Sequence, residues 1–520
     1  MNKVAKTTMI LMIVTMISKV FGFARELVLT YTYGAGITSD VYITSMSIPT
    51  TLFACIATAI STVFIPLFCE IDKEEGRESA IKFTNNIFNV VVILGLLLAI
   101  ATFIFAEPIV KLFAMNFTGE KLRLTVEFTK IMIFGVVFIG LSNIMTSWLQ
   151  INNEFTIPGI IAYPFNICII IGIVLSTKLN LNSMAIGTLI GMSSQFLIQL
   201  PFAIKKGYKY KPYINLKDKY LKKMLPMIMP VFIGVGVSQL NMIVDKSLAS
   251  TLDDGIITIL NSANRLNQFV LGLFITTIAS VVYPMLSKLS KEEDKTIFSK
   301  SVSQSINSVL LLIIPIAVGA MVFAEPVVRI VFERGAFDKQ STSMTAVALS
   351  CYSIGMVGFG IREILNKVFY SIQDTKTPMI NGAMEVILNI ILNVSFIKIL
   401  GYKGLALATS ISSILTTVLL FISLKKRIDN FKSNTVIETL IKSIISSIIM
   451  GLISYFIYKG LINMLGFGLL IESIVLLISV TLGAVVYAIS IILLKVEDVN
   501  TIIENLKVKF NINNKMLKRG

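Results

Sequence analysis

The sequence is poor in the residues on which most enzymes and metalloproteins depend. It contains no histidine, the commonest general base and metal ligand of proteins. Its four cysteines, Cys55, Cys69, Cys168 and Cys351, show no CxxC spacing, so neither a disulfide framework nor a zinc site is expected. The sequence also has no Walker A motif, so ATP binding by that route is not expected.

Charged residues are scarce as well: they make up 15% of the 520 residues, compared with about 25% in soluble domains. Uncharged apolar runs of about twenty residues recur along the whole chain, and each could cross a hydrocarbon core ~30 Å thick as a helix. A soluble enzyme is therefore excluded. We predict an all-α membrane protein with about fourteen transmembrane helices, at residues 8–31, 38–68, 82–106, 126–149, 157–177, 183–204, 222–246, 255–287, 301–324, 341–370, 377–399, 404–424, 435–458 and 467–494.

The net charge of +16 comes mostly from lysines and arginines in the short segments between these runs. Alternate segments hold 28 of these residues on one side of the membrane and 11 on the other, and the segment 205–223 alone holds eight. Because cytoplasmic loops are enriched in Lys and Arg, we predict a multi-pass protein of the bacterial inner membrane with both termini in the cytoplasm. This topology explains the charge without nucleic acid, and no nucleic-acid partner is expected.

An internal repeat relates the two halves of the chain. The segment 58–110 recurs as 276–328, a shift of 218 residues, and Pro158 pairs with Pro378 at a shift of 220. The shift spans six predicted helices, so the copies share one orientation, as in transporters whose cavity lies between parallel repeats. We predict a two-lobed bundle with a central cavity, divided into an N-terminal lobe (1–215), a C-terminal lobe (216–428), two appended helices (429–495) and a cytoplasmic tail (496–520).

Two features are interpreted as structural. The tetrapeptide Phe-Ala-Glu-Pro occurs at 105–108 and again at 323–326, and its proline is expected to end a helix at the outer surface. Lys442 and Glu472, on the last two predicted helices, are expected to pair with each other.

Charged side chains fall inside predicted helices, where each costs about 2.5–3.5 kcal/mol at the bilayer centre. Among them are Lys19, Arg25, Glu26, Arg265, Arg362, Glu363 and Glu385. Lys19, Arg25 and Glu26 share one face of the first helix, within an arc of about 120°. Arg265 and Arg362 lie in two helices of the second half. Guanidinium groups bind phosphate oxygens through planar, charge-assisted hydrogen bonds, so these residues are candidate contacts for an anionic substrate. The alternative is that they form ion pairs between helices.

A second set of polar residues is a candidate coupling-ion site. Asn241 and Asp245, and likewise Asn381 and Glu385, are spaced i, i+4, so each pair lies on one helical face. Carboxylate and amide oxygens inside a membrane suit Na⁺ or a proton, and Asp245, Asn381 and Glu385 are the predicted ligands. The alternative is polar contact between helices. No other cofactor and no metal site is expected.

Several stretches carry a resemblance to a known family. They are Ser-Lys-Val-Phe-Gly-Phe-Ala-Arg-Glu at 18–26, Tyr-Gly-Ala-Gly at 33–36, Ser-Asp at 39–40, Ile-Pro at 48–49, Phe-Glu-Arg-Gly-Ala-Phe at 332–337, and 369–378, which ends in Asp-Thr-Lys-Thr-Pro. Together they resemble the MurJ/MviN lipid II flippases of the multidrug/oligosaccharidyl-lipid/polysaccharide exporter superfamily. The resemblance covers nearly the whole chain.

The resemblance implies a V-shaped cavity that moves an undecaprenyl-diphosphate-linked precursor between leaflets. It assigns substrate-site positions to Arg25, Glu26, Asp40 and Arg265. Lys19 stands where many members have arginine. The sequence departs from the family after Pro49, where Thr-Thr-Leu-Phe at 50–53 lacks an arginine pair that many members carry.

We therefore predict a transporter, not an enzyme: a flippase that carries lipid II from the cytoplasmic to the outer leaflet by alternating access, with roles in peptidoglycan biosynthesis, cell-wall biogenesis and cell shape. Its expected partners are lipid II and membrane lipids, and cell-wall synthesis or division proteins are further candidates. Two alternatives stay open: a flippase for another polyprenyl-linked polysaccharide unit, and a cation-coupled multidrug antiporter. Cationic drugs would favour a net-acidic cavity, whereas cations dominate the candidate site here.

Overall fold

The computed structural model describes residues 3–428, 431 and 433–499, without the side chains of residues 3–13 and 15, and every regular element within them is an α-helix. Most of the predicted cytoplasmic tail, residues 500–520, lies outside the described part. The chain forms two compact units: Met1–Ser262 with Phe332–Ser341, and Ala263–Val331 with the chain from Thr342 onward.

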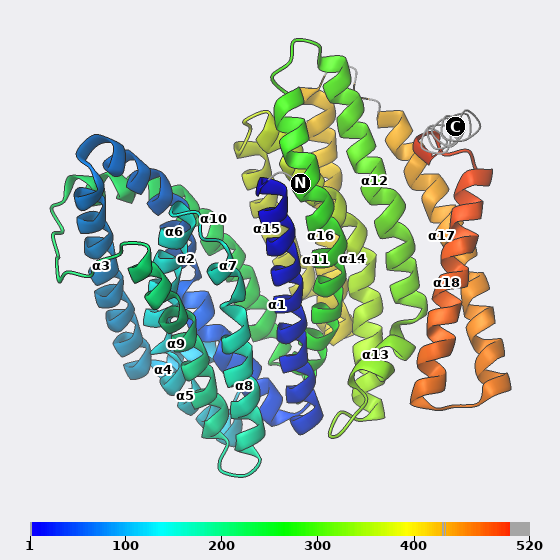
Figure 1. Ribbon diagram of the computed structural model, residues 1–520. Coiled ribbons are helices and arrows are strands. Elements are labelled where there is room, and N and C mark those ends of the chain that lie inside the picture. Colours follow the sequence, from blue (N-terminus) through cyan, green and yellow to red (C-terminus); the bar gives the residue numbers. More distant parts are fainter. Residues whose placement is uncertain (1–2, 429–430, 432, 500–520) are drawn as a thin grey trace, which may run out of the picture. The chain divides into compact units, whose positions relative to one another are not determined.

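The first unit contains α1 to α10, which Figure 1 draws from blue to green. The bounds are α1 Lys3–Tyr33, α2 Ile37–Glu75, α3 Arg77–Ile104, α4 Ala106–Phe113, α5 Gly119–Met132, α6 Gly135–Ile151, α7 Thr156–Ile160, α8 Ala162–Ser176, α9 Asn182–Lys205 and α10 Lys219–Ala249. The second unit holds most of α11 Ile256–Leu289, α12 Lys295–Val322, most of α13 Ala324–Phe332 and of α14 Lys339–Ser371, α15 Lys376–Leu400, α16 Tyr402–Arg427, α17 Ser433–Leu465 and α18 Leu469–Leu493.

The compact units do not divide where the repeat does. The lobes predicted from the repeat meet between residues 215 and 216, whereas the first unit extends to Ser262. The reason is packing: α10 contacts α2 and α4 of the first unit. The lobe limits based on the repeat stay a prediction about internal symmetry.

Twelve helices of the described part are long and apolar enough to cross a membrane, or thirteen if α5 and α6 form one bent span. The expected number of fourteen stays a prediction, because α1 is not among these twelve or thirteen. The prediction of a single helix at 126–149 is wrong, because α5 and α6 bend by 41° at a break between Met132 and Gly135.

The two Phe-Ala-Glu-Pro tetrapeptides start helices as well as end them. α3 ends at Ile104, where the Phe105 N–H donates to the Ala101 carbonyl at 2.9 Å, and α4 begins at Ala106. The proline therefore sits in the first turn of a new helix, where its missing N–H leaves no bond unmade. The second copy repeats this break, since α12 ends at Val322 and α13 begins at Ala324. The prediction of a helix end was right, but it missed the short helices that follow.

A second break recurs at the shift of 220 predicted from the prolines. α6 ends at Ile151 and α7 begins at Thr156; α14 ends at Ser371 and α15 begins at Lys376. Both breaks contain one residue in the left-handed region, Asn153 with φ 58° and Gln373 with φ 62°. In both, the next N–H reaches back to a helix carbonyl: Glu154 to Leu149 at 2.8 Å and Asp374 to Phe369 at 2.9 Å. The repeat is thus visible in the local geometry at this register.

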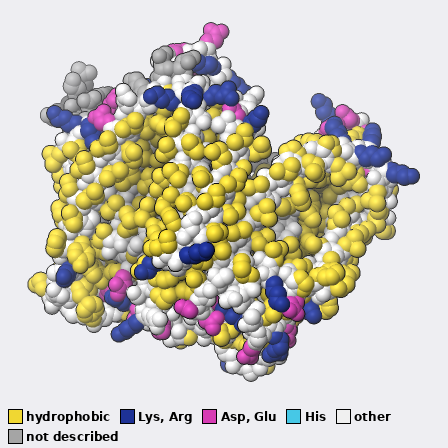
Figure 2. All heavy atoms as spheres, turned by 180° about the vertical axis from the view of Figure 1, so that it is seen from behind, with side chains coloured by type: hydrophobic (Ala, Val, Ile, Leu, Met, Phe, Trp, Pro, Cys, Tyr) yellow, Lys and Arg dark blue, Asp and Glu magenta, His cyan; other side chains and the backbone are white. Residues whose placement is uncertain are grey.

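Each unit has its own core. The first is built around the chain's single tryptophan, Trp148, which is fully buried with the rings of Phe68 and Tyr208 each 5.4 Å away. The second is aliphatic, with a buried stripe on α12 formed by Val302, Ile306, Val309 and Ile313. Outside the cores, hydrophobic side chains cover the middle of the face drawn in Figure 2, and charged side chains gather mainly toward the helix ends. This distribution is that of a multi-pass membrane protein.

Candidate functional site

The charged face of α1 is partly buried inside the first unit. Arg25 is 7% exposed, and its guanidinium carbon lies 5.7 Å from the centroid of the Phe165 ring on α8. Glu26 is 3% exposed and accepts a hydrogen bond from the side-chain amide of Asn261 on α11. Lys19, one and a half turns earlier, is exposed. Burial of two adjacent charges in a helix requires compensation, and here a ring face and an amide supply part of it.

Asp40, in the first turn of α2, anchors the start of α11. Its carboxylate is 1% exposed and accepts bonds from the Gly255 N–H at 2.8 Å, and from the Thr258 N–H and hydroxyl at 2.9 and 2.8 Å. Lys121 on α5 adds an ion pair at 3.0 Å and also binds Asp254 at 2.7 Å. A carboxylate at a helix N-terminus satisfies N–H groups that have no partner in the helix. In this conformation Asp40 therefore positions α11, and its predicted contact with substrate remains untested.

Two of the family-like motifs pack on each other within the first unit. The Ala336 N–H donates to the Tyr31 carbonyl at 2.9 Å. Gly335 has φ 58°, and a Cβ built on it would lie 2.3 Å from that same carbonyl oxygen, so only glycine fits. Gly34, with φ 61°, makes an equally close approach to the Ala336 carbonyl, so the motifs at 33–36 and 332–337 touch directly. Both motifs are recognisable in the sequence, but their contact is visible only in the structure.

The Asp-Thr-Lys-Thr-Pro motif forms the start of α15. Asp374 accepts bonds from the Thr377 N–H at 3.0 Å and the Thr377 hydroxyl at 2.7 Å, and it pairs with Arg427 at 3.2 Å. Partial burial opposes ionisation of this carboxyl, but the bonds from Thr377 and the charge of Arg427 outweigh it and lower the pKa of Asp374. The motif is thus accounted for by helix capping.

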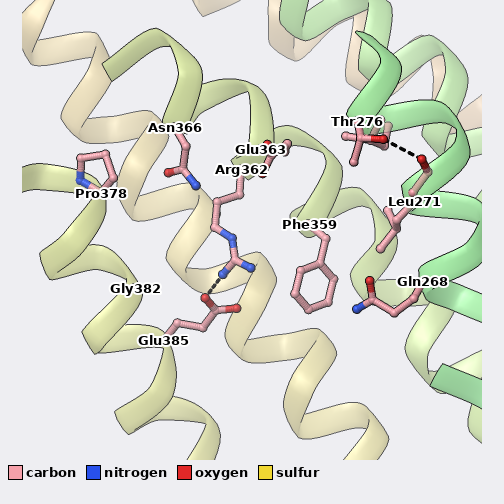
Figure 3. A pocket seen from close by; sticks show the side chains of 12 residues that line it. Gln268, Leu271, Thr276, Phe359, Arg362, Glu363, Asn366, Pro378, Gly382 and Glu385 are labelled. Carbon is pink, nitrogen blue, oxygen red and sulfur yellow. Dashed lines mark hydrogen bonds and ion pairs between the residues drawn. The ribbon is translucent and has the colours of Figure 1, made fainter. Parts of the chain in front are cut away.

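The second unit contains a cavity of about 300 Å³ with an ion pair on its wall (Figure 3). Arg362 on α14 points across the cavity to Glu385 on α15, and the two side chains form an ion pair. They are 19% and 17% exposed, and the Arg362 guanidinium also lies 5.0 Å from the centroid of the Phe359 ring. The pair joins a predicted substrate residue to a predicted coupling-ion residue, which is the ion-pair alternative left open for Arg362.

The cavity also has polar residues that were not among the predicted site residues. Gln268, Thr276 and Asn366 line it, and Glu363 lines it while pairing with Lys367 at 3.2 Å. Asn366 could have been predicted from its spacing, because it lies one helical turn from Arg362 and so on the same face of α14.

The predicted coupling-ion residues are distributed over both units. Asp245 lies on α10 in the first unit and accepts a bond from Asn241 at 3.3 Å, as the i, i+4 spacing predicts. Asn381 lies on α15 in the second unit, is 6% exposed, and donates to the Thr416 carbonyl at 2.9 Å. It does not line the cavity that holds Glu385. Across the described residues, no group of three or more Cys, Asp or Glu side chains is arranged to hold a metal ion.

Arg265 is exposed and lies on α11 in the second unit. The pairing expected between Lys442 and Glu472 is wrong. α17 and α18 pack as a hairpin, so Glu472 at the start of α18 lies beside the end of α17, where Arg329 and the Tyr458 hydroxyl each reach it at 2.8 Å. Lys442 lies at the other end of the hairpin, paired with Glu438 at 2.5 Å.

Comparisons with known proteins agree on one family. The family model described as "Lipid II flippase MurJ" matches residues 29–494. A probable lipid II flippase MurJ of Vibrio cholerae is 31% identical over 443 residues, which cover 81% of this chain and 82% of the relative. The lipid II flippase MurJ of Burkholderia cenocepacia is 28% identical over 424 residues, covering 79% of this chain and 82% of that one.

Similar solved structures include a member of this family and a more distant transporter. A lipid II flippase MurJ in an inward closed conformation matches with a TM-score of 0.79 and 29% identity, over 93% of this chain and all of that one. An inward-facing multidrug resistance transporter of the MATE family, from the MOP superfamily, matches with a TM-score of 0.70 over 82% of this chain and 99% of that one. Its identity is 15%, so it shows the fold alone.

Proposed function

The chain belongs to the lipid II flippase MurJ family, and on this basis we propose that it moves lipid II from the cytoplasmic to the outer leaflet of the bacterial inner membrane. The observation that carries the proposal is the family match over residues 29–494, combined with arginines kept inside apolar helices. A diphosphate cannot cross hydrocarbon unaided, so a carrier must offer fixed cations that replace its hydration. The chain is a transporter rather than an enzyme.

We assign Lys19, Arg25, Arg265 and Arg362 as the residues that contact the diphosphate during alternating access. Guanidinium groups offer a planar pair of donors to phosphate oxygens, and Lys19 offers a point charge. Arg362 is held by Glu385 in the present conformation, so binding substrate requires that it exchange one anion for another. Glu26 and Asp40 contribute by positioning, through their bonds to Asn261 and to the start of α11.

The coupling-ion hypothesis follows from the same exchange. When Arg362 turns to the substrate, Glu385 loses its cation and requires another, either Na⁺ or a proton. Asp245 and Asn381 complete the proposed set of coupling residues. The ion pair thus supports a scheme in which an anionic substrate and a small cation load together.

The direct test is to deplete the protein and identify which lipid-linked precursor accumulates on the cytoplasmic side. Accumulation of lipid II, relieved by the wild-type chain and not by a chain that carries Arg25→Ala, supports the proposal. A variant with Lys442→Gln, remote from the assigned residues in sequence, serves as the matched control and should relieve the block. Accumulation of a different polyprenyl-linked unit would favour the second flippase hypothesis instead. Unchanged precursor pools together with lost efflux of cationic drugs would favour the antiporter.

Proposed orientation follows the positive-inside rule, with both termini in the cytoplasm. Proteins of cell-wall synthesis or division are proposed as partners on functional grounds, because lipid II delivered to the outer leaflet must be consumed there.

A further inference from the structure

The most basic segment of the chain is folded against the side of a helix. Residues 206–218, between α9 and α10, will be called the basic loop; with the helix ends beside it, the segment 205–223 holds eight lysines. The positive-inside rule explains why such a segment is charged, but it requires no particular conformation. The ordered structure of the basic loop therefore needs a separate explanation.

Three buried asparagines of α3 hold the loop backbone. Asn86 binds both backbone groups of one residue: its Oδ1 accepts from the Asn215 N–H at 2.8 Å, and its Nδ2 donates to the Asn215 carbonyl at 2.9 Å. Asn85 donates to the Lys209 carbonyl at 2.9 Å, and Asn89 donates to the Tyr213 carbonyl at 3.1 Å. All three asparagines are at most 8% exposed.

Tyrosines of the basic loop complete the attachment. The Tyr208 hydroxyl donates to Asn85 at 3.0 Å and the Tyr210 hydroxyl to Asn89 at 2.8 Å. The Tyr208 ring also packs on Trp148 in the core of the unit. Lys82 on α3 lies 4.6 Å from the centroid of the Tyr213 ring.

The attachment places the loop alongside α3 rather than beyond its end. Asn85 and Asn89 follow the first residue of α3, Arg77, by eight and twelve residues, which corresponds to about 12–18 Å along a helix axis. α3 is one of the membrane-spanning helices, and Figure 1 shows the loop running beside it. Both asparagines lie in the first two turns of the membrane span predicted at 82–106, so the loop is expected at the level of lipid headgroups.

The outer surface of the loop combines cations with apolar groups. Lys209, Lys211 and Lys217 are exposed. Between them, Ile214 is 54% and Leu216 67% exposed, on either side of the clamped Asn215. Lysines interleaved with exposed apolar side chains are typical of surfaces that sit in the membrane interface, with the apolar groups in the acyl boundary and the cations on anionic headgroups.

We propose that the basic loop is a preformed binding surface for anionic phospholipid headgroups in the leaflet at the α9–α10 end of the first unit. The asparagine clamp lowers the entropy lost on binding, because the lysines are already displayed at the membrane surface. This surface is separate from the residues assigned to lipid II, so it stands or falls independently of the proposed function.

The test measures where Leu216 lies in bilayers of defined composition. The full-length chain, with its four cysteines replaced by serine and Leu216→Cys carrying an environment-sensitive fluorophore, is placed in nanodiscs of phosphatidylcholine or of phosphatidylcholine with increasing phosphatidylglycerol. We expect the emission to shift to shorter wavelength as phosphatidylglycerol increases, and added salt to reverse the shift. Each lysine near an anionic surface is worth about a fivefold preference for the anionic lipid. The variant Lys209→Gln with Lys211→Gln and Lys217→Gln should therefore reduce this preference by about a hundredfold.

Two further variants separate the clamp from the charge. Lys288→Gln with Lys291→Gln and Lys300→Gln removes the same number of exposed lysines from another segment and should leave the shift unchanged. Asn86→Ala keeps every lysine but releases the loop, so this variant should lose the preference for phosphatidylglycerol. The emission of Trp148, which touches Tyr208, reports whether the loop has detached from α3. Equal emission in the two lipid mixtures, as expected for a loop that docks an acidic protein, would overturn the proposal. So would a full preference in the Asn86→Ala chain with its loop released.

Discussion

Arg362 on α14 and Glu385 on α15 form an ion pair on the wall of a cavity in the second unit, and each is less than one-fifth exposed. If one charge were removed, too little water could reach the other to replace the lost ion pair. Removing one member of such a pair lowers the stability of the protein strongly, because the unpaired charge carries the full desolvation penalty. Removing both members changes the stability little. This asymmetry makes its role testable.

Neutralising one member should destabilise the protein, and neutralising both should not. Arg362→Gln or Glu385→Gln leaves a charge without its partner, and we expect a loss of about 3 kcal/mol, the low end of the range for buried pairs because both groups keep some exposure. The double variant Arg362→Gln with Glu385→Gln should recover most of that stability. Thermal unfolding of the purified chain in detergent measures both.

Activity distinguishes a working pair from a structural one. If Arg362 binds the diphosphate and Glu385 the coupling ion, the stable double variant should still fail to support lipid II transport. Full transport by the double variant would show that the pair only holds α14 and α15 together.

Gly335 should tolerate no side chain. Alanine there must adopt the left-handed conformation, which costs about 1–2 kcal/mol, and its Cβ would lie 2.3 Å from the Tyr31 carbonyl oxygen. We therefore expect Gly335→Ala to lower the unfolding temperature and the amount of protein in the membrane. Gly319→Ala is the matched control, since a Cβ on this α12 glycine meets nothing within 4 Å and alanine favours the helix. Equal stability of the two variants would contradict the close packing of these loops.

Asp374 should make the stability depend on pH in a defined window. Its pKa is lowered in the folded state, so the stability it contributes is fully present above its unfolded pKa of about 3.9 and is lost as the pH falls through the lower folded value. Asp374→Asn should therefore unfold at a lower temperature than the wild type near neutral pH, with the difference shrinking below about pH 4. A difference that is constant across this range would mean that the charge of Asp374 adds nothing.

The helical fold was predictable because the length and hydropathy of apolar runs identify membrane-spanning helices. The i, i+4 contact between Asn241 and Asp245 was predictable too, since it depends only on helix geometry. The break between α5 and α6 was not, because no proline marks it and the apolar run continues across it.

Pairs between distant helices were the least predictable part of the site. The sequence placed Arg362 and Glu385 on helical faces but not opposite each other, and it assigned them to different functions. Lys442 and Glu472 were matched by charge alone, whereas the hairpin geometry puts them at opposite ends. Asp40 meets Gly255 and Thr258 more than 200 residues later in the chain, which no local pattern reveals.

The orientation of the chain can be read by chemical labelling. In a background without native cysteines, Ile37→Cys and Asp338→Cys should react with an impermeant thiol reagent added to intact cells, because both positions are exposed and are predicted to lie outside. Lys209→Cys, exposed on the basic loop, should react only after the membrane is opened. Labelling of position 209 in intact cells would reverse the assigned topology.

The cations assigned to the diphosphate should be essential for transport without being essential for folding. Arg25→Ala and Arg265→Ala, each as the only copy, should fail to support growth while the protein reaches the membrane at normal abundance. Arg25→Lys should fail partly, because lysine keeps the charge but loses the planar pair of donors, and Lys19→Arg should be tolerated.

Arg25 is the sharper case, since it is 7% exposed and lies beside the buried Glu26. If Arg25 served only to balance that carboxylate, Arg25→Ala would lower abundance, and adding Glu26→Gln would restore both abundance and growth. If it binds the diphosphate, the added Glu26→Gln restores neither growth nor transport. Membrane abundance by immunoblot and lipid II transport, measured on Arg25→Ala with and without Glu26→Gln, separate the two outcomes.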